Sequence, residues 1–107
     1  MNKQILRLTT EYIDRIRKHQ EKLSELIDPK YGLTQILQTR GVFSINHCEE
    51  IKEEKTTATK NRKLLELLLR ATRESDLVWF SAALKETGQQ HVLNYILWDG
   101  GKFFLSV

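Results

Sequence analysis

Few side chains in this sequence could carry out catalysis or bind a metal ion. The chain has three histidines, His19, His47 and His91, and a single cysteine, Cys48. Only His47 stands beside the cysteine, and neighbouring residues on a helix point about 100° apart, so the two side chains cannot hold one ion together. No glycine-rich phosphate loop, zinc-binding spacing or nucleophile elbow occurs. We therefore expect no enzymatic activity, no metal and no cofactor.

The cysteine indicates both a structural role and a compartment. Cys48 falls at the spacing of core-facing residues, so we expect a small buried hydrophobic side chain. A lone cysteine excludes an intrachain disulfide and is typical of a reducing compartment. No apolar run approaches the roughly 20 residues that span a bilayer, and the first residues have no signal-peptide core. We therefore expect a cytoplasmic protein that does not enter a membrane.

Charge is unevenly distributed along the 107 residues, whose net charge is +3. Residues 56–73 carry five basic and one acidic side chain, a net charge of +4, whereas residues 28–55 carry four basic and five acidic ones, a net charge of −1. Patches of opposite sign steer and orient protein partners. Most single charges on such helices are simply solvated, so the prediction rests on the patches. The acidic run Glu49–Glu54 could hold a cation weakly, but a solvated or partner-facing surface is the simpler interpretation.

Composition and periodicity predict an all-α chain. One proline, five glycines and long stretches of Leu, Glu, Lys, Arg and Gln favour helix. Apolar residues recur at helical spacing in six segments with short connections, which is typical of an antiparallel bundle. The first segment, some 25 residues ending at Ile27, is long for a small domain, so we expect it to bend. The others run from Asp28-Pro29 to about Arg40, from Ser44 past Ile51, over residues 61–72, from Ser75 or Asp76 past Leu84, and from about Gln89 to Trp98.

The fourth segment should be the most buried helix, because its five leucines cover more than one face. Trp79 and Trp98 are expected in the core and at its edge, and an exposed Trp98 would be an interface anchor. The expected core includes Ile13, Ile16, Leu37, Ile51, Leu65, Leu68, Phe80, Leu84 and Leu93.

Polar residues and glycines at the ends of these segments predict where the helices start and stop. Asp28 can cap the second helix, with Pro29 in its first turn. Gly41 should end that helix. The expected N-caps of the later helices are Ser44, then Thr57 or Thr59, then Ser75 or Asp76. Thr87-Gly88 and Asp99-Gly100-Gly101 should end the last two helices.

Two stretches of the chain carry a pattern of particular residues. In residues 27–69, Asp-Pro opens a helix, Gly41-Val42-Phe43 follows its end, and a short acidic helix leads through a Thr-rich loop to Arg62-Lys63-Leu64-Leu65. In residues 75–97, a Glu-Thr-Gly-Gln turn separates the two last helices. Together these patterns resemble caspase-recruitment domains, or CARDs, of the death-fold superfamily, over roughly residues 8–98. The chain departs from the family at Arg73-Glu74-Ser75, where members often have Lys-Gly.

The resemblance implies a six-helix antiparallel bundle with a bent first helix over residues 1–98, followed by a tail at 99–107. It also implies homotypic binding to other CARDs, including those of a caspase or an adaptor, in apoptosis or in innate immune and inflammasome signalling. In the family a basic surface of helices one and four commonly meets an acidic surface of helices two and three. The candidates for the basic half are Arg15, Arg17, Lys18, Lys60, Arg62 and Lys63. The candidates for the acidic half are Asp28, Glu49, Glu50 and Glu53.

A helical nucleic-acid-binding domain is the alternative interpretation, because the chain is basic and the cations Lys60, Arg62 and Lys63 stand at the start of the fourth helix. Two features count against it. The leucines of that helix leave little surface for reading a groove, and no Arg/Lys/Asn cluster marks a recognition helix.

Overall fold

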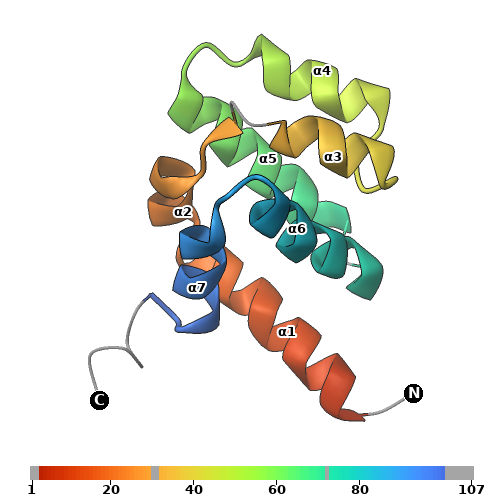
Figure 1. The fold of residues 1–107 in the computed structure, drawn as a ribbon, viewed down its shortest axis with the longest axis vertical. Helices are drawn as coiled ribbons and strands as arrows, with labels where there is room; N and C mark the ends of the chain where they lie inside the picture. The colour runs from red at the N-terminus through yellow and green to blue at the C-terminus, as the bar shows by residue number, and fades with distance from the viewer. Residues whose placement is uncertain (1–2, 30–31, 72, 101–107) are drawn as a thin grey trace.

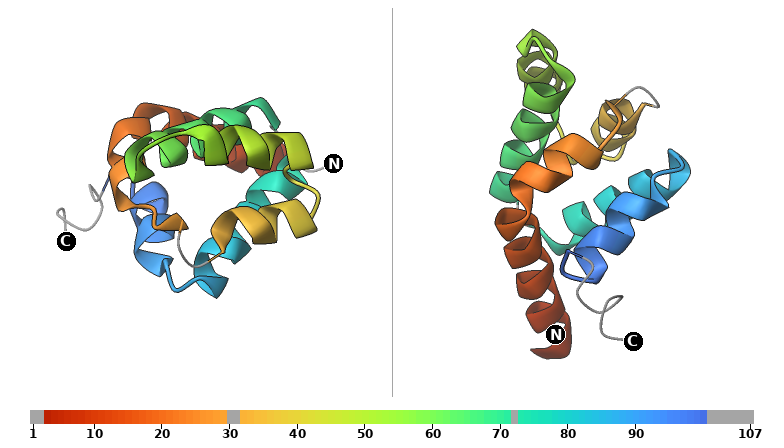
Figure 2. Two further views of the ribbon diagram at one scale, coloured as in Figure 1. Left: turned by 90° about the horizontal axis from the view of Figure 1, so that it is seen from above. Right: turned by 90° about the vertical axis from the view of Figure 1, so that its left-hand side faces the viewer.

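The computed structural model describes residues 3–29, 32–71 and 73–100. Within these ranges the chain forms seven helices and no strand, arranged as a bundle (Figure 1). The helices are α1 (Lys3–Lys18), α2 (Gln20–Leu26), α3 (Leu33–Thr39), α4 (Ile45–Glu53), α5 (Thr57–Ala71), α6 (Glu74–Glu86) and α7 (Gln90–Leu97). In both views of Figure 2, α1, α4 and α5 lie on one side of the molecule and α3, α6 and α7 on the other.

The predicted bend of the first helix is confirmed, and it accounts for the seventh helix. α1 and α2 are separated only by His19, whose ψ of 22° departs from helical geometry. Backbone hydrogen bonding continues on both sides, from His19 N to Arg15 O at 3.0 Å and from Leu23 N to His19 O at 2.9 Å. The bend lets the second limb bury Leu23 and Ile27, which are 0 % and 2 % exposed.

α5 is the central helix, as its leucines predicted. It contacts α1, α2 and α4, and Leu64, Leu65, Leu67 and Leu68 are all buried. The other expected core residues are buried as well, except Ile13, which is partly buried and packs against the core. Trp79, which was expected in the core, is only partly buried and packs against it.

Two buried amide side chains hold the backbone where it leaves α2. The Asn61 Nδ2 donates to Ser24 O at 2.8 Å and to Ile27 O at 2.7 Å. The Gln89 Oε1 accepts from Asp28 N at 2.7 Å, and its Nε2 donates to Asp28 O at 2.8 Å. Asn61 and Gln89 are 0 % and 2 % exposed. Buried backbone groups need such partners, so these amides tie α2 to α5 and to the turn between α6 and α7.

This arrangement corrects the predicted start of the second helix. α3 begins at Leu33, with Gly32 as N-cap in the left-handed region at φ 83°. It does not begin after Asp28-Pro29, because Gln89 binds both backbone groups of Asp28 and so fixes the chain there. The N-cap of α3 is therefore Gly32 and not Asp28.

The expected N-caps of α5 and α6 were also wrong. α5 begins at Thr57, and Thr56 caps it: the Thr56 Oγ1 accepts from Thr59 N and the Thr59 Oγ1 accepts from Thr56 N, both at 3.1 Å. This reciprocal pair uses two amides that would otherwise lack partners. α6 begins at Glu74. Asp76 lies inside that helix with a buried carboxylate, which accepts from Arg73 Nε at 3.1 Å and Nη2 at 3.0 Å.

The other predicted helix ends are confirmed. Gly41 ends α3 at φ 80°, where Gly41 N donates to Gln38 O and Val42 N to Leu37 O, a Schellman arrangement. Ser44 caps α4, and Thr87-Gly88 ends α6. α7 ends before Asp99 and Gly100, both at positive φ. Gly101 and the apolar tail lie outside the described residues, so the division of the chain at residue 98 stays a prediction.

Truncating the central leucine should destabilise the fold strongly. Leu68 is fully buried in α5, and Leu68→Ala is expected to cost on the order of 2–5 kcal/mol, as buried leucine truncations do. Urea unfolding followed by circular dichroism measures the loss. Leu69→Ala is the matched control on the same helix, because Leu69 is only partly buried, and it should cost less. A Leu68→Ala variant with the parent's melting temperature would show that α5 is not the central helix.

Stability should fall at high pH through Tyr12. Burial of its phenol, which shares a 2.8 Å hydrogen bond with Ser81 on α6, raises the pKa from 10.0 to about 12. Between these values the unfolded phenol loses its proton while the folded one keeps it, so stability falls as pH rises. Between pH 9 and 11 the parent should lose on the order of 1 kcal/mol more than Tyr12→Phe does. Urea unfolding at the two pH values measures the free energy of unfolding of each protein. If this free energy falls equally in the parent and in Tyr12→Phe, the assignment is contradicted.

Candidate protein-interaction surface

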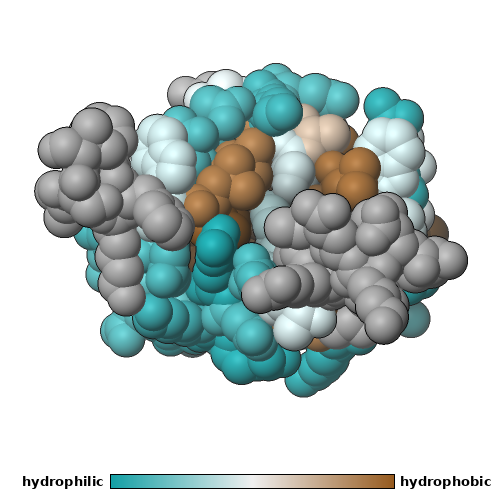
Figure 3. Space-filling model, turned by 90° about the horizontal axis from the view of Figure 1, so that it is seen from below, coloured by the Kyte–Doolittle hydropathy of each residue, from teal (hydrophilic) through white to brown (hydrophobic). Residues whose placement is uncertain are grey.

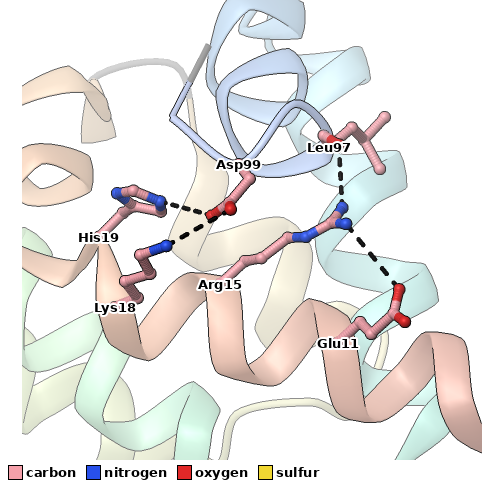
Figure 4. Close-up of polar contacts among 6 residues, drawn as sticks. All are labelled: Glu11, Arg15, Lys18, His19, Leu97 and Asp99. Atoms are coloured by element: carbon pink, nitrogen blue, oxygen red, sulfur yellow. Dashed lines mark hydrogen bonds and ion pairs between the residues drawn. The ribbon is translucent and has the colours of Figure 1, made fainter. Parts of the chain in front are cut away.

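The structure places two of the three predicted basic residues of α1, Arg15 and Lys18, against the end of α7 (Figure 4). The Arg15 Nη1 donates to Leu97 O at 2.9 Å, and its Nη2 lies 3.8 Å from a Glu11 carboxylate oxygen. The Lys18 Nζ lies 3.4 Å from Asp99 Oδ2. Arg15 and Lys18 therefore make contacts within the molecule. A guanidinium on the last carbonyls of α7 also suits the negative end of the helix dipole.

Arg17, the third predicted cation of this helix, is an exposed surface residue. Its Nη1 lies 3.6 Å from Asp14 Oδ1, and both side chains are more than half exposed. Such an ion pair contributes little to stability, because water screens it. Arg17 is therefore available to a partner at small cost.

The three predicted cations of α5 have different surroundings. The Lys60 Nζ donates to Lys52 O at 3.0 Å, and so caps the C-terminal turn of α4. The Lys63 Nζ lies 3.7 Å from Glu66 Oε2. Arg62 is exposed and makes no ion pair or hydrogen bond with any residue that the structure describes. A shallow hollow of about 110 Å³ lies at this corner, lined by Glu54, Thr59, Arg62, Lys63 and Glu66.

The predicted acidic residues fall into two groups. Glu49, Glu50 and Glu53 are exposed on α4, which packs on α5 and α3. Asp28 follows α2, and its backbone is held by Gln89 at the start of α7. The compact acidic surface is therefore the glutamate face of α4, and Asp28 belongs to another part of the molecule.

α4 presents its glutamates on a locally fixed helix. The Ser44 Oγ accepts from His47 N at 3.1 Å, and the His47 Nδ1 accepts from Ser44 N at 3.2 Å. The His47 ring also meets the buried Phe43 ring edge to face at 5.8 Å. Cys48 and Ile51 anchor the opposite face in the core. The acidic face therefore has a defined direction before any partner binds.

Apolar side chains contribute little to the described surface. The large exposed ones are Ile45, Val78, Leu97 and Trp98, at 67 %, 60 %, 44 % and 37 % exposure. Where the face seen in Figure 3 is not covered by grey atoms, its apolar areas are small and set among hydrophilic side chains. Such scattered residues are normal on a soluble protein, so charge is the more distinctive property of this surface.

Two groups of surface residues were missed from the sequence. Arg40 of α3 lies over the ring of Trp79 on α6 at 4.5 Å, and its Nη2 lies 3.9 Å from Glu86. His19 and Asp99 form the second group, with His19 Nε2 and Asp99 Oδ1 2.8 Å apart. No signal in the sequence predicts either pairing, because the partners are far apart along the chain, 80 residues for His19 and Asp99.

The described residues hold no arrangement typical of a metal site, since no group of three or more His, Cys, Asp or Glu side chains converges there. Burial raises the pKa of the Cys48 thiol, and the smaller effects of Lys52 and Glu49 oppose each other. A thiol of raised pKa is a poor nucleophile. None of the described helices is long and apolar enough to cross a membrane.

The chain belongs to the CARD family: residues 13–97 match the family model of the caspase recruitment domain. This match begins within α1 and includes all the helices that follow. No curated protein and no solved structure gives a significant match. CARDs are homotypic protein-interaction modules of apoptotic and inflammatory signalling, and the domain is not catalytic.

Cys48 should be chemically protected in the folded protein. It is 7 % exposed, so we expect slow reaction with a maleimide in buffer and fast reaction in denaturant. The matched control is the double variant Cys48→Ser/Ser75→Cys, which moves the thiol to an exposed position at the start of α6 and should react fast in both conditions. Rapid labelling of the native parent would show that Cys48 is not a core residue.

Proposed function

We propose that this chain assembles signalling complexes in the cytoplasm by binding other CARDs, its own copies included, and so recruits a caspase or an adaptor. The observation that carries the proposal is the pair of oppositely charged surfaces on adjacent helices. Arg62 and Lys63 lie on the first half of α5, and Glu49, Glu50 and Glu53 are exposed on α4, which packs on α5.

A surface with both signs can bind a second copy head to tail. When the acidic face of one molecule meets the basic face of the next, the same contact is left open at each end. Such heterologous contacts propagate into open helices unless the rotation closes a ring. This geometry suits a module that places enzymes side by side.

Contacts within the molecule favour some of the predicted cations over others for the basic half of the proposed interface. Arg15 and Lys60 each donate to a backbone carbonyl at a helix end, so their substitution would also disturb the fold. Arg17, Arg62 and Lys63 are the cations best placed for a partner. Each exposed pair contributes about 0.2–1 kcal/mol, and several in a row fix orientation and partner.

Charge reversal on either face should abolish homotypic binding while the helical spectrum is unchanged. We expect this of Arg62→Glu/Lys63→Glu and of Glu49→Lys/Glu50→Lys, because each places like charges opposite one another. A mixture of the two variants should recover binding, since the repulsive contacts become attractive again. Analytical ultracentrifugation at low salt measures the association, which should weaken as salt rises, because exposed charges are screened beyond roughly 8–10 Å.

Arg70→Glu is the matched control, because Arg70 is an exposed cation on the same helix, about 12 Å further along its axis. It should leave association close to that of the parent. Folded reversal variants that still assemble normally at low and high salt would reject the charge-patch mechanism. If the parent bound nonspecific duplex DNA at low salt and did not bind itself, nucleic-acid binding would be the better assignment.

A further inference from the structure

The clearest polar cluster outside the proposed interface joins the end of α1 to the end of α7. His19 Nε2 and Asp99 Oδ1 are 2.8 Å apart, and the two side chains are 15 % and 23 % exposed. The Lys18 Nζ reaches the other oxygen of the same carboxylate at 3.4 Å. The His19 ring also packs edge to face on Tyr95 of α7 at 5.3 Å. The Asp99 carboxylate therefore contacts both Lys18, the last residue of α1, and His19, which follows it (Figure 4).

The backbone after α7 has an unusual shape that delivers this carboxylate. Asp99 has φ 47°, and it is the one residue other than glycine with positive φ among those that the structure describes. Gly100 follows at φ 77°, and a Cβ there would lie 2.7 Å from His19 Cε1. Asp tolerates the left-handed region better than most residues, and Gly adopts it freely. The turn therefore brings Asp99 back onto α1, where any larger side chain at position 100 would strike His19.

We propose that this turn is an autoinhibitory contact: Asp99 occupies, within the same molecule, a position on α1 that a carboxylate of an acidic CARD surface would otherwise take. The inference rests on the proposed function, because it assumes that acidic faces of other copies bind the basic side of this chain. The inference adds that Lys18 and His19 can contact the acidic face of another copy only when Asp99 no longer contacts them.

A contact of this kind lowers affinity without changing the interface itself. When only a fraction of molecules has the site open, the apparent dissociation constant is the intrinsic one divided by that fraction. Lys18 is 52 % exposed, so its share of the contact is weak and reversible, whereas the His19 contact is better shielded. An acidic partner at high local concentration can then displace Asp99, because the ion pairs that it forms replace those that it breaks.

The decisive variant is Asp99→Asn, which removes the charge and keeps a residue that tolerates positive φ. We expect it to associate about tenfold more tightly than the parent, as removal of a contact closed nine-tenths of the time would give. The matched control is Glu25→Gln, which also removes one carboxylate, here the exposed partner of Lys22, a cation outside the proposed interface. If Asp99→Asn does not bind more tightly than Glu25→Gln, the proposal is wrong.

A second readout tests the contact without any association. Lys18 and Lys22 have side chains of nearly equal exposure, 52 % and 54 %, so their labelling by an amine-reactive ester can be compared within one molecule. Lys18 should label more slowly in dilute parent protein than in Asp99→Asn, whereas the labelling rate of Lys22, which pairs with Glu25 at 3.8 Å, should be the same in both proteins. Unchanged relative rates would overturn the contact, even if self-association were observed.

The two measurements separate failure of this inference from failure of the proposed function. If no variant self-associates but Asp99→Asn releases Lys18, the contact exists and has no homotypic partner to exclude, so its autoinhibitory role is rejected. If Asp99→Asn does not fold, Asp99→Gly replaces it, because glycine adopts the same backbone conformation and also lacks the carboxylate. A folded Asp99→Gly that binds like the parent would equally reject the proposal.

Discussion

The packing of this domain depends on how the backbone leaving α2 satisfies its polar groups. Residues 24–28 pass between α5 and the α6–α7 turn, and an unpaired peptide group that is buried there costs about 1–3 kcal/mol. The carboxamides of Asn61 and Gln89 supply the partners, two bonds each. An amide side chain has both a donor and an acceptor, so Gln89 can bind Asp28 as a neighbouring strand would. This pairing fixes α2, α5 and α7 relative to one another and delays the start of α3.

The same demand for partners at chain ends explains why a basic sequence does not become an equally basic surface. Each helix leaves carbonyls without partners at its C-terminal end, and cations suit that end of the dipole. Arg15 serves the end of α7 and Lys60 the end of α4. These side chains brace the bundle, so the cations left for a partner are those facing water, Arg17 and Arg62 among them. The acidic face of α4 has no such internal use and stays available.

An interface made of exposed charges is weak in each contact and strong only through repetition and orientation. The rigid presentation of α4 matters for this reason, because a partner then meets glutamates whose helix is already fixed by the Ser44 cap and by buried Cys48 and Ile51. The cluster at Asp99 acts in the same range of energies, so a single carboxylate from the molecule itself can compete with those of a partner.

The sequence by itself determined the helices, most of the core and several helix ends, because these depend on local spacing. The leucines of α5, the Gly41 stop and the Ser44 cap are all set by residues within a few positions of one another. The starts of α3, α5 and α6 were not predicted, because other residues bind the backbone there. At α5 the side chains of Thr56 and Thr59 bind each other's backbone N–H groups. Before α3 the backbone of Asp28 is bound by Gln89, which is distant in the sequence. The candidate site was determined only as a list of charges. Which of them face water was decided by contacts such as Arg15 to Leu97 and Lys18 to Asp99, 82 and 81 residues apart. Such pairs form only after α7 has packed on α1, so only the tertiary structure can separate a cation that braces the fold from one that awaits a partner.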